Sequence, residues 1–536
     1  MALFEVKNLT FGYPLADKII NGVSFTVEQG DFIAVCGPTG SGKTTLLRLM
    51  KPELAPLGDK SGEVLFEGVR TDDLTPEQSA AIGFVSQSPE HQIVTDKVWH
   101  EVVFGMENLR FPQNLMKRRV AEIMSYFGID TLFDKNTAEL SGGQKQMIAL
   151  SGVLVMNPKV IILDEPTSQL DPVSASEFLT TLRKLNEELG ITIILTEHRL
   201  ENVVPLCNKL CVIENGRITA FGETRQTVRE ITGNDRIAAS MPGSVRLYKI
   251  LGAHGECPIN ITEGKKYFRE HFTRNTVPFD EEKPPEGKKA ARLKNVYFRY
   301  EKNAPDVLHN TSLTAYENEI LCVLGSNGSG KTSLLYTIAG LTSPYAGSVE
   351  IFGKNIRKYK GQSLYNNCIS LLPQDAQTVF LHNTLEEEFG SAGISFEDAP
   401  YDLSYAAKTH PYDLSGGEQQ LAALALVLAS KPRILLLDEP TKGLDSYAKQ
   451  KVRDALKKLK EQGLTIIIVT HDVEFAALCA DRAAMFFRGE CVCVDTPKKF
   501  FSENIFYTTS TARIVSGICD GLINPDDVRK YAEGSV

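Results

Sequence analysis

Gly37-Pro-Thr-Gly-Ser-Gly-Lys43-Thr44-Thr45 lies between two apolar segments of a 536-residue chain. The run Phe32-Ile-Ala-Val-Cys36 before it predicts a buried strand, and Thr45-Leu-Leu-Arg-Leu-Met50 after it predicts the start of a helix. Strand, glycine loop and helix are the setting of the phosphate-binding pattern G-x-x-x-x-G-K-[ST]. Glycines let backbone N–H groups close around phosphates, and the helix N-terminus adds partial positive charge. We expect Lys43 to contact the β- and γ-phosphates and Thr44 to ligate Mg²⁺.

The same pattern recurs at Gly325-Ser-Asn-Gly-Ser-Gly-Lys331-Thr332-Ser333, after the apolar run Ile320-Leu-Cys-Val-Leu324. Two copies predict an internal repeat with two nucleotide-binding domains. The residues predicted to bind nucleotide phosphates are Gly37, Gly40, Ser41, Gly42, Lys43, Thr44 and Thr45 in the first copy, and Gly325, Gly328, Ser329, Gly330, Lys331, Thr332 and Ser333 in the second.

The composition limits the class of protein. With 42% apolar and 23% charged residues, the chain has the balance of a soluble globular protein of several domains. A net charge of −9 disfavours a nucleic-acid-binding surface as the main function. We find no run of 18 apolar residues and no signal peptide in Met1-Ala-Leu-Phe-Glu-Val-Lys7. The sequence therefore predicts a cytoplasmic protein that reaches a membrane only through a partner.

Paired carboxylates end a buried strand in each half. They are Asp164-Glu165 after Val160-Ile-Ile-Leu, and Asp438-Glu439 after Ile434-Leu-Leu-Leu. Ligands bind at the C-terminal ends of parallel strands in open α/β sheets. We expect Asp164 and Asp438 to hold Mg²⁺ and Glu165 and Glu439 to act as general bases for the attacking water. A turn with a helix cap is the alternative for one such pair, and the second copy argues against it.

Four further features recur beside these motifs, each with an ordinary structural alternative. An aromatic residue before the phosphate loop fits purine stacking rather than simple packing. A Gln at a strand end fits a place near Mg²⁺ or the attacking water. Ser-Gly-Gly at a helix start offers a hydroxyl and free N–H groups to a γ-phosphate, or is merely a cap. A His after a buried strand fits a γ-phosphate contact. These residues are Tyr13, Gln87, Ser141 with Gly143, and His198, and then Tyr300, Gln374, Ser415 with Gly417, and His471.

The spacing of the motifs agrees between the halves. Ser141 precedes Asp164 by 23 residues, and Ser415 precedes Asp438 by the same number. Chance matches do not keep such distances across five motifs. Taken together, these residues resemble the ATP-binding cassette (ABC) ATPases, in tandem and over nearly the whole chain. The resemblance implies an α/β fold with two ABC nucleotide-binding domains, each with a RecA-like parallel-sheet core, an antiparallel β subdomain, a helical subdomain and a small C-terminal helical extension.

The same resemblance implies the nucleotide chemistry. ATP and Mg²⁺ are the expected ligands, with Thr44, Gln87, Asp164, Thr332, Gln374 and Asp438 near the metal. Glu165, His198, Gln87, Glu439, His471 and Gln374 are the expected catalytic residues. In this family ATP binds between cassettes arranged head to tail, so Ser415 would serve the first phosphate loop and Ser141 the second.

Two segments resemble the ATPases of energy-coupling factor importers, which take up vitamins and transition-metal ions. They are Gln87–Gln92 with the following Val98–Asn108, and Thr196–Glu201. In that family the ATPases bind an integral membrane scaffold and a separate membrane protein that selects the substrate. Acidic residues after the Gln loop meet arginines of the scaffold, and Glu90 and Asp375 occupy such places here. An ordinary solvated carboxylate is the alternative for both.

The resemblance and the repeats divide the chain as follows. The first ABC domain covers residues 1–232 and its C-terminal extension 233–276; a linker follows over 277–290; the second domain covers 291–500 and its extension 501–536. Cys257-Pro-Ile-Asn260 with Tyr267 parallels Gly521-Leu-Ile-Asn524 with Tyr531, which makes the extensions a repeat. The linker is rich in proline and charge, as in Asp280-Glu-Glu-Lys-Pro-Pro-Glu286.

The expected function is that of an ATP-hydrolysing subunit, peripheral on the cytoplasmic face of the cell membrane, that powers such an importer. The alternative is a soluble tandem ABC ATPase that acts on ribosomes or DNA. The short proline-rich linker and the lack of a basic tail count against that alternative. In that importer family the transported substrate is chosen by another polypeptide, so the resemblance implies no particular substrate for this chain.

Overall fold

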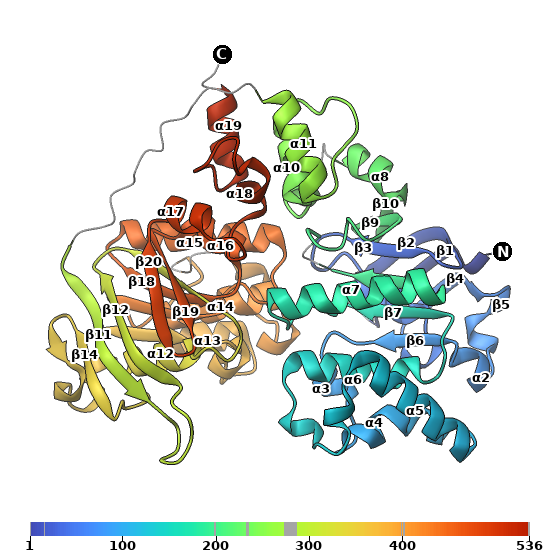
Figure 1. The fold of residues 1–536 in the computed structure, drawn as a ribbon, viewed down its shortest axis with the longest axis horizontal. Helices are drawn as coiled ribbons and strands as arrows, with labels where there is room; N and C mark the ends of the chain where they lie inside the picture. Colours follow the sequence, from blue (N-terminus) through green and yellow to red (C-terminus); the bar gives the residue numbers. More distant parts are fainter. Residues whose placement is uncertain are drawn as a thin grey trace. The chain divides into compact units, whose positions relative to one another are not determined.

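The computed structural model describes residues 2–14, 17–197, 200–231, 235–272, 287–397, 399 and 402–533. Its internal contacts divide the chain into two compact units, Met1–Val245 and Arg246–Val536 (Figure 1). Each unit contains one six-stranded and one four-stranded sheet. The predicted α/β fold with two copies of a parallel-sheet core and an antiparallel sheet is therefore confirmed.

The larger sheet of the first unit has the strand order β10-β9-β3-β8-β7-β6. Its strands pair in parallel except for β10, which is antiparallel to β9. The smaller sheet is antiparallel, with the order β2-β1-β4-β5. The strands are β1 (Ala2–Gly12), β2 (Lys18–Glu28), β3 (Phe32–Cys36), β4 (Asp59–Phe66), β5 (Val69–Arg70), β6 (Ile82–Val85), β7 (Val160–Asp164), β8 (Thr192–Thr196), β9 (Lys209–Glu214) and β10 (Arg217–Glu223).

The apolar runs of the sequence become the central strands of this sheet. Every residue of β3, β7 and β8 is buried, as expected for parallel strands covered on both faces. The helices of the first unit are α1 (Lys43–Leu49), α2 (Pro76–Ser79), α3 (Pro89–Gln92), α4 (Val98–Asn108), α5 (Gln113–Phe127), α6 (Gly142–Leu154), α7 (Pro172–Leu189), α8 (Thr224–Ile231) and α9 (Asp235–Ala238). Helices α4, α5 and α6 share a separate apolar core that includes Val102, Met106, Met124 and Ile148.

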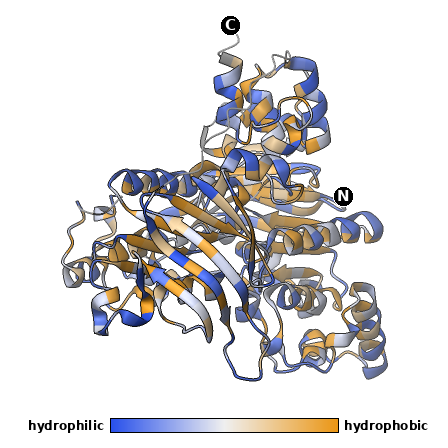
Figure 2. Cartoon of the chain, turned by 60° about the vertical axis from the view of Figure 1, so that its left-hand side comes forward, coloured by the Kyte–Doolittle hydropathy of each residue, from blue (hydrophilic) through white to orange (hydrophobic). Residues whose placement is uncertain are grey.

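The second unit repeats this plan. Its larger sheet has the order β16-β17-β18-β13-β19-β20, and its antiparallel sheet the order β12-β11-β14-β15. The strands are β11 (Lys289–Phe298), β12 (Leu308–Tyr316), β13 (Ile320–Leu324), β14 (Ala346–Ile351), β15 (Lys354–Asn355), β16 (Ile369–Leu372), β17 (Ile434–Asp438), β18 (Thr465–Thr470), β19 (Arg482–Phe487) and β20 (Glu490–Asp495). The helices of its cassette are α12 (Lys331–Ala339), α13 (Leu385–Ala392), α14 (Gly416–Leu428), α15 (Ser446–Glu461), α16 (Val473–Cys479) and α17 (Pro497–Glu503). In Figure 2 the strands in the interior of the cartoon are largely hydrophobic, whereas the foreground strands and the outer helices are mixed, which matches burial of one face of these outer elements.

Helices that follow the two cassettes pack together within the second unit. They are α10 (Gly243–Ile250), whose residues from Arg246 belong to this unit, and α11 (Ile261–His271) from the first half, and α18 (Ser510–Val515) and α19 (Pro525–Glu533) from the second. Leu247 and Phe268 share one apolar core with Ile514 and Val528. The rings of Phe272 and Tyr531 stack with centroids 5.6 Å apart. We call this group of helices the C-terminal bundle.

Among the described residues, none of the helices combines the length and the apolar character needed to cross a lipid bilayer.

Candidate active sites

Each phosphate loop joins a buried strand to a helix, β3 to α1 and β13 to α12. Gly42 and Gly330 precede these helices with φ angles of 96° and 101°, which a residue with a Cβ adopts only under strain. The Lys43 ammonium donates to the carbonyls of Gly37 and Pro38 at 2.8 and 2.9 Å. Lys331 makes the same two bonds in its own loop, both at 2.9 Å. Each ammonium is thus held inside the curve of its loop.

A serine hydroxyl lies inside each loop without a hydrogen-bond partner. Ser41 and Ser329 are 4% and 6% exposed, and within the described residues no group bonds to either Oγ. A buried hydroxyl without a partner costs free energy unless a ligand satisfies it. Together with the helix N-terminus and the lysine, these hydroxyls fit a bound phosphate chain.

The aromatic residues predicted to stack on a purine lie against the same helices. The Tyr13 hydroxyl lies 3.2 Å from Thr45 Oγ1, and the Tyr300 hydroxyl lies 2.9 Å from Ser333 Oγ. Tyr300 is 61% exposed, so much of its ring remains free to contact a ligand. These contacts bring both tyrosines to the phosphate loops, whereas stacking on a base stays a prediction.

Asp164 and Asp438 end their strands beside the phosphate loops but differ in their partners. Asp164 Oδ1 accepts from Thr44 Oγ1 at 3.0 Å and from Thr196 Oγ1 at 2.7 Å. Neither oxygen of Asp438 accepts a hydrogen bond of sound geometry within the described chain. Val469 occupies the place of Thr196 in the paired strand and has no hydroxyl to offer.

The protonation of these two aspartates reflects their surroundings. Burial raises the pKa of Asp164, and its hydrogen bond from Thr196 opposes that rise. Burial raises the pKa of Asp438 to about 6, while the nearby Thr332 hydroxyl and the Lys331 charge pull it down. A buried carboxylate with unsatisfied oxygens beside a threonine hydroxyl is a donor set that suits Mg²⁺. Asp438 with Thr332 therefore fits the predicted metal, and the other predicted ligands stay a prediction.

The neighbouring glutamates face the same sites with a strained backbone. Glu165 and Glu439 have φ angles of 44° and 51°, in the left-handed region that residues with a Cβ seldom adopt. Glu165 Oε2 accepts from Gln87 Nε2 at 2.8 Å. Glu439 Oε2 instead lies 2.8 Å from His471 Nδ1. Burial would raise the pKa of Glu439, but the His471 hydrogen bond and the charges of His471 and Lys331 hold it below its ordinary value.

In the second cassette these groups line one cavity of about 340 Å³. Its walls include Lys331, Thr332, Gln374, Asp438 and Glu439, together with Tyr300's contact Ser333 and the loop residues Asn327 and Gly328. The loop lysine, the two carboxylates and the strand-end glutamine are thus gathered around a space at the ends of parallel strands. That arrangement can bind a nucleotide phosphate and activate a water beside it.

The serines predicted to contact a γ-phosphate, Ser141 and Ser415, cap long helices. Ser141 accepts from the Gln144 N–H at the start of α6, and Ser415 accepts from the Glu418 N–H at the start of α14. Gly143 and Gly417 lie in the first turns of these helices. Their contact with a nucleotide held by the other cassette stays a prediction. His198 lies outside the described residues.

Sequence reasoning missed Thr196. It is the last residue of β8 and bonds to Asp164 because β7 and β8 pair with Asp164 opposite Thr196. A threonine at the end of a strand whose three middle residues are apolar was the available indication. The pairing register of β7 and β8 could not be read from the sequence.

A family model described as ABC transporter matches residues 20–168 and 308–442 of the chain. A Bacillus anthracis protein, named provisionally as an ABC transporter ATP-binding protein, is 38% identical over 526 residues, which is 95% of both chains. A protein of Methanosarcina mazei with the same name is 32% identical over 92% of this chain and 89% of its own.

Two solved structures are also similar. The Clostridium perfringens protein cbiO1, described as part of the ABC transporter complex cbiONQ, is 32% identical and covers 44% of this chain and 97% of its own, with a TM-score of 0.39. The archaeal ribosome recycling factor aABCE1 is 19% identical over 92% of this chain and 91% of its own, with a TM-score of 0.59. At that identity the second likeness shows a shared tandem fold and nothing of function.

Proposed function

The chain belongs to the ABC transporter family, and we propose that it is the ATP-hydrolysing subunit of a membrane importer of the energy-coupling factor type. Its two cassettes are those of an ATPase. The observation that carries the proposal is the presence of both complete motif sets in one chain whose Gln87–Gln92 and Thr196–Glu201 segments resemble that importer class. The substrate would be a vitamin or a transition-metal ion, selected by a separate membrane protein.

In each cassette, phosphate binding, proton transfer and metal binding are proposed for different residues. Lys43 and Lys331 bind the phosphates, and Glu165 and Glu439 take a proton from the attacking water. Bound Mg²⁺ would neutralise charge on the phosphate oxygens, and Thr44, Gln87 and Asp164, or Thr332, Gln374 and Asp438, would hold it. His471, close to Glu439, would contact the γ-phosphate, as would His198 in the first cassette.

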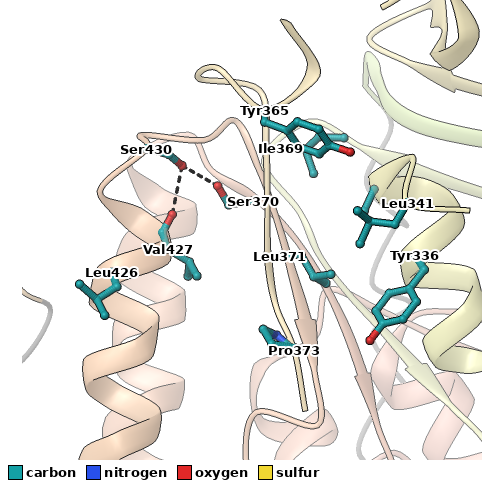
Figure 3. A pocket seen from close by; sticks show the side chains of 11 residues that line it. Tyr336, Leu341, Tyr365, Ile369, Ser370, Leu371, Pro373, Leu426, Val427 and Ser430 are labelled. Atoms are coloured by element: carbon teal, nitrogen blue, oxygen red, sulfur yellow. Dashed lines mark hydrogen bonds between the residues drawn. The ribbon is translucent and has the colours of Figure 1, made fainter. Parts of the chain in front are cut away.

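An apolar groove in the second cassette supports the proposal that the chain binds a membrane partner. The groove has a volume of about 530 Å³ and lies between α12, β16 and the end of α14 (Figure 3). Its lining includes Tyr336, Leu341, Leu371, Pro373 and Leu426. Pro373 directly precedes Gln374, a residue of the nucleotide cavity. A cytoplasmic helix of a membrane scaffold that fills this groove would therefore adjoin the segment carrying the catalytic glutamine.

The first cassette offers a different surface on α4, the helix that follows its Gln87–Gln92 segment in the sequence. Trp99 and Phe104 on α4 are 39% and 37% exposed, and the ring of His100 stacks on Trp99. Glu90, proposed to meet an arginine of the scaffold, forms an ion pair of 2.6 Å with Lys145 and is 61% exposed at its side chain. Asp375 in the second cassette accepts the Gln377 N–H at the start of a short turn of 3₁₀ helix. Both carboxylates would exchange these partners for a scaffold arginine.

Affinity purification of the tagged chain from detergent-solubilised membranes tests the proposal. Mass spectrometry is expected to identify a polytopic scaffold and a small hydrophobic binding protein among the co-eluting proteins. Recovery with ribosomal proteins, or in the soluble fraction alone, would contradict the importer role and favour a soluble tandem ATPase.

A further inference from the structure

In both cassettes a carboxylate stands three residues after the histidine that is predicted to contact the γ-phosphate. Glu201 follows His198 and Glu474 follows His471 at this spacing. Each glutamate accepts a backbone N–H at the first residue of a helix of the C-terminal bundle.

The two contacts are equivalent. In the first unit, the Gly243 N–H at the start of α10 donates to Glu201 Oε2 at 2.7 Å. In the second unit, the Ser510 N–H at the start of α18 donates to Glu474 Oε1 at 2.7 Å, and the Ser510 hydroxyl donates to the same oxygen at 2.8 Å. Negative charge is favourable at a helix N-terminus, where N–H groups lack partners inside the helix. The same device therefore joins the segment after each histidine to the following extension.

In the second cassette this segment adjoins His471, which contacts the proposed general base Glu439. His471 contacts Glu439 through Nδ1, and its backbone N–H donates to Glu439 Oε2 at 3.2 Å. Asp472 caps α16, the short helix that carries Glu474. Only two residues separate His471 from Glu474, so a shift of α16 would move the histidine relative to the general base.

Helix α10 of the first half reaches the same glutamate. Arg246 Nη2 lies 3.6 Å from Glu474 Oε2, whereas Ser510 bonds to the other oxygen. The two carboxylate oxygens thus face two different helices of the C-terminal bundle. Leu247, the next residue of α10, is in the apolar core of that bundle.

We propose that Glu474 is a positioning residue that ties the segment after His471 to the C-terminal bundle, so that the bundle fixes this histidine for hydrolysis. The proposal rests on the catalytic roles given above to His471 and Glu439 and does not depend on the importer role. It assigns the bundle a part in turnover in addition to holding the helices together.

Steady-state ATP hydrolysis by the purified chain tests the proposal. Measured in a Glu165→Gln chain, turnover reports mainly on the second cassette. We expect Glu474→Ala to lower kcat about three- to tenfold with little change in the KM for ATP, because the histidine acts after binding. Glu474→Gln keeps an oxygen that accepts the Ser510 N–H, and it is expected to restore most of kcat. Glu461→Ala, which removes an exposed carboxylate at the end of α15, is the matched control.

Ser510→Pro provides an independent variant with Glu474 intact. Proline is tolerated at the first position of a helix and removes both the N–H and the hydroxyl that Glu474 accepts. The same fall in kcat is expected. A kcat equal to that of the control in both variants, a change in KM alone, or a Glu474→Gln chain as slow as Glu474→Ala would each overturn the proposal. Failure to find a membrane partner would leave this result unaffected.

Discussion

Glu165 and Glu439 occupy the same place in their cassettes but have different hydrogen-bond partners, Gln87 in the first and His471 in the second. If each acts as a general base, replacement by glutamine removes the proton acceptor while keeping shape. We expect Glu165→Gln and Glu439→Gln each to lower hydrolysis in its own cassette by about 10²–10⁴-fold, and the double variant to lower total turnover by that factor. Phosphate release by the purified chain measures this.

Glu461→Gln is the control for this pair of substitutions, since Glu461 is exposed at the end of α15. Near-normal turnover in the double variant would show that neither glutamate is the base. A loss in only one single variant would show instead that the two cassettes hydrolyse ATP unequally.

The two aspartates differ because Thr196 has Val469 as its counterpart, and this difference has a consequence for stability. An aspartate in the unfolded chain has a pKa of about 3.9, whereas burial raises the pKa of Asp438 to about 6. Between these values the folded chain binds more protons than the unfolded chain, so stability contributed by this group falls as pH rises from about 4 to about 6. Asp438→Asn is expected to flatten that fall.

Thermal unfolding of the nucleotide-free chain in EDTA, followed from pH 4 to pH 7, measures the effect. Val469→Thr supplies the hydroxyl that Asp164 already receives from Thr196, and should also flatten the profile by lowering the pKa of Asp438. A Val469→Thr profile that superimposes on the native one would argue that burial alone sets this pKa.

At the scale of elements, the apolar groove of Figure 3 is the surface proposed to bind the membrane scaffold. Leu341 lines it and is 57% exposed, so Leu341→Arg should leave the fold intact while placing a charge in an apolar contact. We expect this variant to lose co-purification with the membrane scaffold and to keep its ATP turnover in isolation. Ile505→Arg, at a residue 77% exposed in the C-terminal region, is the control. Equal recovery of the scaffold with both variants would exclude the groove as its docking site.

The sequence predicted best the strands that consist of consecutive apolar residues. The runs before both phosphate loops and both Asp-Glu pairs became fully buried parallel strands, because four or five consecutive apolar residues suit a strand covered on both faces. Contacts between distant elements were beyond prediction, as for Thr196 with Asp164 and Arg246 with Glu474, because they depend on strand register and helix packing.

At the scale of the whole molecule, the first-half helices α10 and α11 raise the question of what holds the two halves of the chain together. By sequence they follow the first cassette, yet from Arg246 onward their contacts place them in the second unit. Phe268 is fully buried in a core shared with Ile514 and Val528 of the second half. The predicted linker, 277–290, lies largely outside the described residues. The bundle therefore provides a noncovalent connection that does not require the linker.

A protease site inserted into the linker near Pro285 tests this connection. After cleavage in the absence of nucleotide, we expect residues before and after the cut to elute together in size-exclusion chromatography. Phe268→Asp buries a charge in the shared core and should let the cleaved fragments separate, whereas Lys266→Asp, at an exposed position of the same helix, should not. Separation of the cleaved native chain would show that the linker alone joins the halves. Joint elution of the cleaved Phe268→Asp chain would place the connection in contacts other than this bundle.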